Sequence, residues 1–207
     1  SKMKDAISAP VTLAIAMTYV GYYADGDELR WALGAPDTKE YDWCFKFATA
    51  AVVGDNTHFT VAMLPVGHSE YRDADSYPGD DQYYRVGEVV RELLDTARKY
   101  VNVSSIVADR EFYAGDVIEA CEERDLFYLI PANRNERVRR TLRRFGSEVY
   151  VRKEYGIYGP IKGGSDNERV ETTLVVLPDD DSRDGPSPFV TTLQVYDVIG
   201  WDTLRTK

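Results

Sequence analysis

Residues 104–132 read "SSIVADREFYAGDVIEACEERDLFYLIPA" and decide the fold class of this sequence. An apolar run ends abruptly at Asp109, which predicts a buried strand over residues 103–109. A helix is expected over about 114–124, and a second apolar strand over 126–132. A strand, a helix and a strand in this order indicate an α/β sheet. Asp109 then lies at the C-terminal end of a strand, where ligand sites gather in open α/β sheets.

The chain before this stretch predicts three strands and a helix. Apolar, β-rich segments predict strands over residues 11–23, 43–53 and 58–66, the last two joined by a turn at 54–57. Apolar residues recur on one face of 85–100, the pattern of an amphipathic helix. The polar stretches 24–42 and 68–81 are expected to be loops.

The chain after this stretch predicts a basic helix and then a β-rich region. The helix covers residues 135–145, and short β-like pieces with glycine turns follow over 147–177. One more strand is expected over 189–199, after an acidic loop rich in proline and glycine.

Three strands followed by strands alternating with helices is the chain order of a ribonuclease H-like α/β mixed sheet flanked by helices. We therefore predict a ribonuclease H-like core over residues 1–145 and a β-rich insertion over 146–187. Residues 188–207 are predicted to return a strand to the core. In such a sheet the first and fourth strands are neighbours, so carboxylates on them converge on one site.

Composition narrows the classes of protein to consider. The sequence has 35 acidic and 25 basic residues, a net charge of −10, and more Asp than Glu. Hydrated carboxylates suit concentrated salt, which indicates a halophilic source. An acidic protein is a poor nucleic-acid binder in ordinary buffers, but screening by high salt weakens that objection. Two distant cysteines fit a reducing cytoplasm. No apolar run approaches the roughly 18 residues of a membrane helix, and we expect no signal peptide.

Asp109 is the first candidate site residue. A carboxylate at a strand end suits a hard cation such as magnesium, which takes one or two protein carboxylates and completes its shell with water or phosphate oxygens. Two such ions can activate an attacking hydroxyl and stabilise the leaving oxygen at phosphorus. The alternative is that Asp109 caps the next helix or pairs with Arg110.

The segment "VADREFYAGDVIEACEERDLFYLIP", residues 107–131, resembles the second-Asp segment of the DDE transposases of bacterial and archaeal insertion sequences. The segment 41–66, "YDWCFKFATAAVVGDNTHFTVAMLPV", is similar to strands of the haloarchaeal, insertion-sequence-4-type members. The resemblance implies a ribonuclease H-like catalytic domain that cuts and joins DNA at transposon ends with Mg²⁺ or Mn²⁺. It also implies a homodimer acting on paired ends.

The resemblance places the family's first catalytic Asp in the segment "LAIAMTYVGYY", where this sequence has Ala16. Alanine offers no oxygen to a metal. Asp25, Asp27 and Glu28 would replace it only if the chain folded back. Two explanations fit Ala16: a deliberate inactivating substitution, or a decayed copy of a mobile element.

The family's third acid, a Glu, is expected on a helix after the insertion. No segment matches its spacing, and the sequence reaches Lys207 about where that helix should begin. Glu168 and Glu171 fall in the insertion and are expected to be solvated strand residues. We therefore expect the chain as written to be catalytically disabled.

Basic residues provide the candidate DNA contacts. Six arginines lie between residues 134 and 144 of an otherwise acidic sequence. Helical spacing places Arg137, Arg140 and Arg144 on one face and Arg139 and Arg143 on the adjoining one. Val138, Leu142 and Phe145 form a narrow apolar stripe for docking. Guanidinium groups bind phosphate in bidentate fashion, which predicts contact with the DNA backbone. The alternative is a solvated helix neutralised by the many acids.

The insertion adds further bases in "RKEYGIYGPIKGG", residues 152–164, including Lys153 and Lys162. Bases interleaved with tyrosines can line a DNA groove or stack on unpaired bases. They can equally be ordinary hairpin pairs.

Two other functions stay open at this point. One is a non-catalytic DNA-binding or assembly module on the same fold. The other is a different metal nuclease, such as a resolvase or exonuclease, which would need acids gathered elsewhere, for example Asp25, Asp27 or Glu28 close to Asp109.

Overall fold

The structure of the chain is a computed structural model, and it describes residues 9–24, 32–35, 39–54, 57–66, 86–158, 169–178 and 185–193. The chain divides into two compact units, Ser1–Val103 and Ser104–Lys207. The described residues form strands in both parallel and antiparallel pairs, together with three α-helices. The mixed α/β class predicted from the sequence is therefore confirmed. The predicted division into core, insertion and return strand stays a prediction.

The first unit is built on long antiparallel strands. These are β1 (Val11–Tyr22), β3 (Trp43–Gly54) and β4 (Thr57–Val66). Strand β3 pairs with β1 on one side and with β4 on the other. All three strands were predicted, whereas β2 (Leu33–Gly34) lies in the predicted loop 24–42. It pairs with Trp43 and Cys44 at the start of β3. Its extended conformation therefore depends on this partner strand and not on its own sequence.

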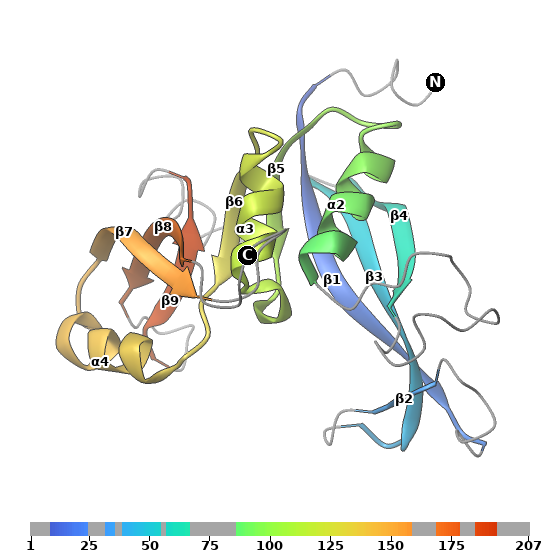
Figure 1. The fold of residues 1–207 in the computed structure, drawn as a ribbon, viewed down its shortest axis with the longest axis horizontal. Coiled ribbons are helices and arrows are strands. Elements are labelled where there is room, and N and C mark those ends of the chain that lie inside the picture. Colours follow the sequence, from blue (N-terminus) through green and yellow to red (C-terminus); the bar gives the residue numbers. More distant parts are fainter. Residues whose placement is uncertain are drawn as a thin grey trace. The chain divides into compact units, whose positions relative to one another are not determined.

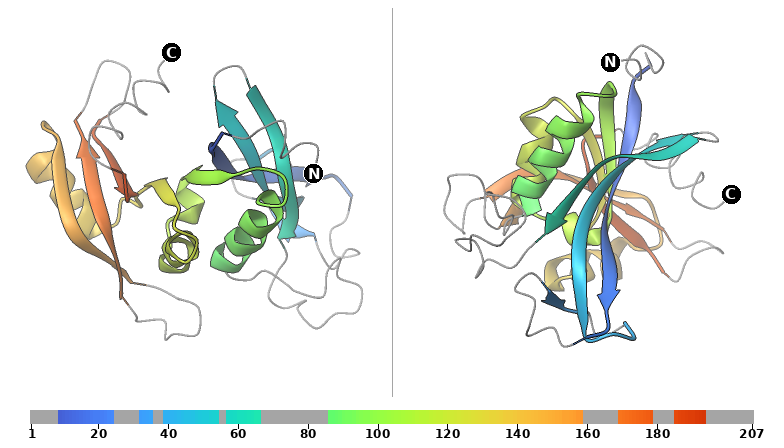
Figure 2. Two further views of the ribbon diagram at one scale, coloured as in Figure 1. Left: turned by 90° about the horizontal axis from the view of Figure 1, so that it is seen from above. Right: turned by 90° about the vertical axis from the view of Figure 1, so that its right-hand side faces the viewer.

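Helix α2 (Val86–Ala97) covers one face of this sheet, as Figures 1 and 2 show. It contacts β3 and β4, and its buried side chains include Leu93 and Leu94. In β1, Leu13 and Ile15 are buried, whereas Ala14 and Ala16 between and beyond them are half-buried. Successive side chains of a strand point to opposite faces. Ala16 therefore lies on the opposite face of β1 from Leu13 and Ile15.

The second unit contains the segment of residues 104–132. Strand β5 (Val103–Ala108) pairs in parallel with β6 (Phe127–Pro131), and α3 (Gly115–Glu122) connects them after the short 3-10 helix η3 (Arg110–Phe112). The predicted strand, helix and strand are thus confirmed. A parallel pair needs such a crossover, because a tight turn can join only antiparallel strands.

The rest of the second unit extends the sheet from β6. Strand β9 (Ser187–Thr191) pairs with β6, β8 (Arg169–Leu177) pairs with β9, and β7 (Tyr150–Tyr158) pairs with β8, all antiparallel. Figures 1 and 2 show α4 (Glu136–Phe145) beside these strands. The β-rich region was expected to contain short pieces, but β7 and β8 each have nine residues.

Strand β9 differs from the predicted strand 189–199 at both ends. It begins two residues earlier, at Ser187, and stops at Thr191. The Thr191 hydroxyl oxygen accepts a hydrogen bond from the Leu193 amide at 2.9 Å. A side chain that bonds the backbone two residues ahead turns the chain out of the ladder.

The core of the second unit lies under β6, β8 and β9. Leu129, Val175, Leu177 and Phe189 form a buried cluster against which Val107 packs. Buried polar groups beside this cluster are hydrogen-bonded. The Tyr128 hydroxyl lies 2.7 Å from Thr172 Oγ1, and Thr191 Oγ1 donates to the Tyr128 carbonyl at 2.6 Å. These bonds join β6 to β8 and β9 and fix the sheet that carries α4.

Several sequence expectations concern residues outside the described ranges. The predicted loop 68–81, turn residues Asp55 and Asn56, and residues 194–199 of the last strand are among them. Among the described helices, none is both long enough and apolar enough to cross a membrane.

Candidate functional site

Asp109 directly follows β5, at the strand end where the sequence placed it. Its backbone is extended, and Oδ1 accepts a hydrogen bond from the Glu111 amide at 2.8 Å, so the residue caps η3. The capping role considered from the sequence is therefore confirmed for the Oδ1 oxygen of Asp109.

Ala16 lies in the middle of β1 and pairs with Thr49 of β3. Its carbonyl accepts a hydrogen bond from Thr49 Oγ1 at 3.2 Å, and its side chain is a half-buried methyl group. Ala16 belongs to the first unit and Asp109 to the second. The methyl side chain offers no oxygen to a hard cation.

The fit of the chain to a divalent metal can be tested on its donor atoms. Within the described ranges, no group of three or more His, Cys, Asp or Glu side chains is placed to hold a metal ion. Asp109 alone does not make a two-metal site of the kind that phosphoryl chemistry uses. The described residues alone do not complete such a site, and Mg²⁺ or Mn²⁺ stays a prediction for the intact family site.

The other acids considered from the sequence fall into two groups. Asp25, Asp27, Glu28 and Glu168 lie outside the described residues. Glu171 is exposed on β8, where its carboxylate lies 2.9 Å from Arg169 Nη1. This is the solvated strand position that the sequence predicted for Glu171.

Helix α4 begins at a side-chain cap and is held to its unit by a narrow apolar stripe and a ring stack. Asn135 caps the helix by accepting a hydrogen bond from the Val138 amide at 2.9 Å. Val138 is the buried residue of the helix. The Phe145 ring stacks on Tyr150 of β7, with centroids 4.1 Å apart and planes 7° from parallel. The apolar stripe predicted from the sequence therefore faces the strands.

Four arginines of α4 are exposed: Arg139, Arg140, Arg143 and Arg144. Glu136 is the acidic partner nearest to two of them, at 2.9 Å from Arg143 and 4.0 Å from Arg140. From residue 134 to 145 the chain has six arginines and one glutamate, a net charge of +5 in a protein of net charge −10. One carboxylate cannot neutralise this surface, which leaves a concentrated patch of guanidinium groups. We call these four residues the arginine patch.

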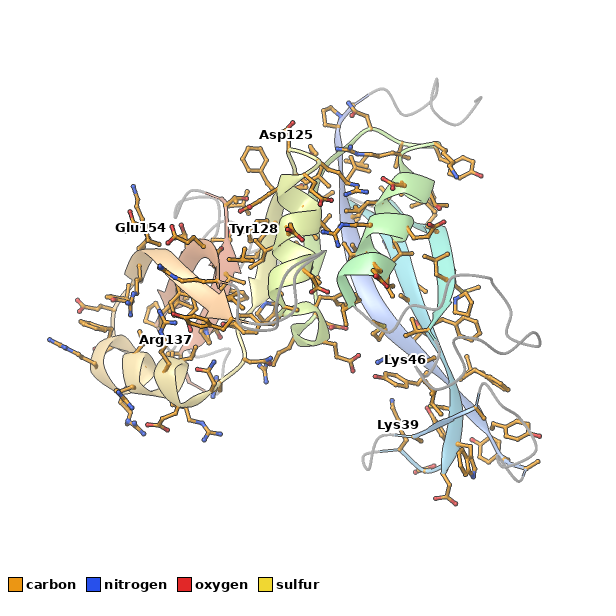
Figure 3. The ribbon with its side chains drawn as sticks, viewed as in Figure 1. Lys39, Lys46, Asp125, Tyr128, Arg137 and Glu154 are labelled. Atoms are coloured by element: carbon orange, nitrogen blue, oxygen red, sulfur yellow. The ribbon has the colours of Figure 1, made fainter. Side chains whose placement is uncertain are left out.

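Arg137 differs from the arginine patch because it turns inward. It is half-buried, its Nη1 donates to the Gly156 carbonyl of β7 at 2.8 Å, and its guanidinium lies 4.2 Å from the centroid of the Tyr155 ring. Figure 3 shows Arg137 between α4 and the strands of its unit. These contacts use Arg137 to attach α4 to β7. Its contact with DNA stays a prediction, although its guanidinium is already engaged.

Tyr155 also interacts with Tyr113, in the turn that follows Asp109. Burial raises the pKa of Tyr113, and a side-chain hydrogen bond with Tyr155 raises it further. Tyr155 itself is 1% exposed. The base-stacking role considered for the tyrosines of this segment is therefore wrong for Tyr155, because its ring is covered by Arg137 and the strand. The sequence did not single out Tyr113, since a tyrosine beside a helix start carries no distinctive signal.

The two lysines predicted to bind DNA in the insertion have different positions. Lys162 lies outside the described residues, and Lys153 is exposed on β7. Lys153 and Glu154 form a bulge, because Arg152 pairs with Leu174 while Tyr155 pairs with Thr172. Glu154, shown in Figure 3, has a positive φ of 55°, and its carbonyl accepts a hydrogen bond from Arg169 Nη2 at 2.9 Å. The hairpin pairing considered from the sequence is confirmed for β7 and β8.

A buried carboxylate, Asp116, was also missed by the sequence reasoning. It is 2% exposed in the first turn of α3. Negative charge is favoured there because backbone amides point out of a helix N-terminus. Its place between Gly115 and Val117 gives no sign of burial, so sequence alone would not have found it.

Comparison with known proteins adds no family to this geometry, because no protein-family model and no curated protein matches the sequence. Any functional assignment therefore rests on the residues themselves.

Proposed function

We propose that this chain carries the ribonuclease H-like catalytic domain of a DDE transposase, in a form disabled at its first acidic position, Ala16. The observation that carries the proposal is the segment from β5 to β6, in which a strand ends at Asp109 and a turn, a helix and a parallel strand follow. Its wording resembles the second-Asp segment of those enzymes. Ala16 supports the second half of the proposal, since it offers no carboxylate.

The arginine patch supports DNA as the partner. Guanidinium groups bind phosphate oxygens strongly and in a fixed geometry. Four of them are exposed on one helix that is attached to β7 by Phe145 and Arg137. A rigid helix holds its charges in place before DNA arrives, which reduces the entropy lost on binding. Transposon ends as the target, and a homodimer as the acting form, remain parts of this proposal.

The proposal is tested by restoring a carboxylate at Ala16. Calorimetric titration with Mn²⁺ is expected to show binding to Ala16→Asp and none to the unaltered chain. Adding Asp109→Ala to that variant should abolish binding. The matched control is Ala14→Asp, because Ala14 lies on the same face of β1 and is also half-buried. If Ala14→Asp binds Mn²⁺ as well as Ala16→Asp does, position 16 is not specific and the proposal fails.

A second candidate, a non-catalytic DNA-binding or assembly module, is favoured by Ala16 itself. This function needs the arginine patch but no metal. It predicts DNA binding that Mn²⁺ leaves unchanged, even in Ala16→Asp. The transposase proposal predicts tighter DNA binding with Mn²⁺ in that variant, because the ions would bridge carboxylates and phosphate oxygens. DNA titrations with and without Mn²⁺ separate the two functions.

A further inference from the structure

A pair of lysines lies beside several tyrosine rings in the first unit, at the end of β1 and the start of β3. Tyr19 pairs with Lys46, and Gly21 pairs with Cys44. Residues directly opposite each other in an antiparallel pair point to the same face. Tyr19, Lys46, Gly21 and Cys44 therefore share one face. This surface belongs to the first unit, whereas the arginine patch belongs to the second.

Two lysines gather on the Tyr19 ring. The Lys46 Nζ lies 5.3 Å from the ring centroid, and the Lys39 Nζ lies 5.9 Å from it. Figure 3 shows both side chains at the same end of the long strands. Only eight of the 207 residues are lysines, and two of them lie at this one ring. Burial raises the pKa of the nearby Cys44 thiol, and both ammonium groups oppose that rise.

Tyrosine rings extend this surface beside the lysines. Tyr41 lies across Gly21 so closely that a Cβ at position 21 would come 2.5 Å from its ring, and its hydroxyl donates to the Tyr19 carbonyl at 3.5 Å. Tyr23 meets the Tyr41 ring edge-on, with centroids 6.1 Å apart. Tyr23 is 84% exposed. Gly21 thus lets Tyr41 support an outer ring whose faces are open to solvent.

We propose that Lys39, Lys46 and Tyr23, supported by Tyr19 and Tyr41, bind a single strand of nucleic acid. Two neighbouring cations attract a phosphate, and an open ring stacks on a base. The strand must be single, because in a duplex the base faces are covered by their neighbours and reach a side chain only after unpairing. Exposed Glu40 and Asp42 in the same segment lower the local potential. Binding is therefore modest and falls as salt rises.

The site does not depend on the proposed transposase activity, and its test is arranged to keep the two apart. The probe is a fluorescein-labelled oligothymidylate of about 12 nucleotides, a length typical of single-strand sites. Binding to the whole chain is followed by fluorescence anisotropy at low salt. A duplex of the same length is titrated in parallel, because duplex affinity reports on the arginine patch.

The expected result is an approximately tenfold loss of single-strand affinity in Tyr23→Ala, the order of one lost base stack. Tyr23→Phe keeps the ring and should keep the affinity. Lys39→Ala is expected to weaken binding severalfold, whereas Lys99→Ala should not. Lys99 is the matched control, since it is an exposed lysine in the same unit. Far-ultraviolet circular dichroism checks that each variant is folded.

Three outcomes would overturn the proposal. The first is an unaltered chain that does not bind the oligothymidylate. The second is equal loss in Lys39→Ala and Lys99→Ala, which would mean that only net charge matters. The third is a loss of single-strand affinity in Lys39→Ala without a loss in Tyr23→Ala, together with competition by inorganic phosphate. The surface would then bind an anion and not a strand. Loss of duplex binding alone, after changes to the arginine patch, bears on the proposed function and leaves this site standing.

Discussion

Helices α2 and α4 have similar lengths and both have a distinct apolar side, yet they have different roles in the molecule. Helix α2 buries seven residues, whereas α4 buries Val138 alone. The first helix is therefore part of a core. The second is attached from outside by a ring stack and one inward arginine, and its arginine-rich side is exposed. The contrast shows that amphipathic spacing finds a helix without saying whether the core or a partner needs it.

The largest effect in this comparison is expected from Leu93→Ala in α2. Leu93 is fully buried, and removing such a side chain costs about 2–5 kcal/mol through lost burial and the cavity that remains. Urea denaturation should show this loss in the free energy of unfolding. The exposed neighbour Glu92 provides the control, because Glu92→Ala should change stability by no more than about 0.5 kcal/mol. Equal effects at both positions would contradict the core role of α2.

A smaller loss, about 2 kcal/mol, is expected from Arg137→Ala in α4. The change removes a charge-assisted hydrogen bond to the Gly156 carbonyl and the guanidinium contact with Tyr155. Thermal and urea unfolding should show a clearly lower stability for Arg137→Ala than for Arg139→Ala. Arg139 is the control because it is an exposed arginine of the same helix. If the two variants are equally stable, Arg137 does not attach α4 to β7.

The cap of α4 is expected to contribute less, about 1 kcal/mol. Asn135→Ala removes the side-chain acceptor of the Val138 amide and leaves that donor without its cap. Asn133→Ala is the matched control, because the Asn133 carbonyl accepts a hydrogen bond from the Asn135 amide and this backbone oxygen is kept in the variant. The denaturation midpoint of Asn135→Ala should be lower than that of Asn133→Ala. The reverse order would mean that the cap does not stabilise the helix.

The smallest effect on stability is expected from replacing the whole arginine patch, Arg139, Arg140, Arg143 and Arg144, with Gln. Exposed ion pairs contribute about 0–1 kcal/mol, and removing crowded like charges offsets the loss of the pairs with Glu136. Duplex affinity should nevertheless fall. The slope of log K against log salt should drop by about 0.9 for each DNA phosphate that α4 no longer neutralises. An unchanged slope would mean that α4 does not touch DNA.

Local patterns made most of the secondary structure predictable. The apolar runs of β1, β3 and β5 and the repeating apolar face of α2 are properties of short segments, and each gave an element close to its observed bounds. Strand β2 was missed because two residues carry no period. The lengths of β7 and β8 were missed because their extension depends on pairing with each other across residues 159–168, which the local sequence does not encode.

The candidate site was predictable only in part, for a related reason. Asp109 was found because the end of a strand is visible in the sequence. The inward turn of Arg137 was not, because helical spacing orders side chains around an axis without saying which side meets a sheet. Likewise, Lys46 lies opposite Tyr19 through strand register, which is set by tertiary pairing, and Lys39 reaches the same ring from a segment outside the strands.

The bulge in β7 has a consequence for how copies of this protein behave in concentrated solution. Among the described strands, β7 has β8 as its partner, so its other side is a template on which a strand of another molecule could add. The extra residue at Lys153–Glu154 breaks the regular spacing of amides and carbonyls there, and three charged side chains, Arg152, Lys153 and Glu154, stand exposed at the break. A deletion that straightened this strand would remove that protection, and copies of the protein would be expected to associate through this edge.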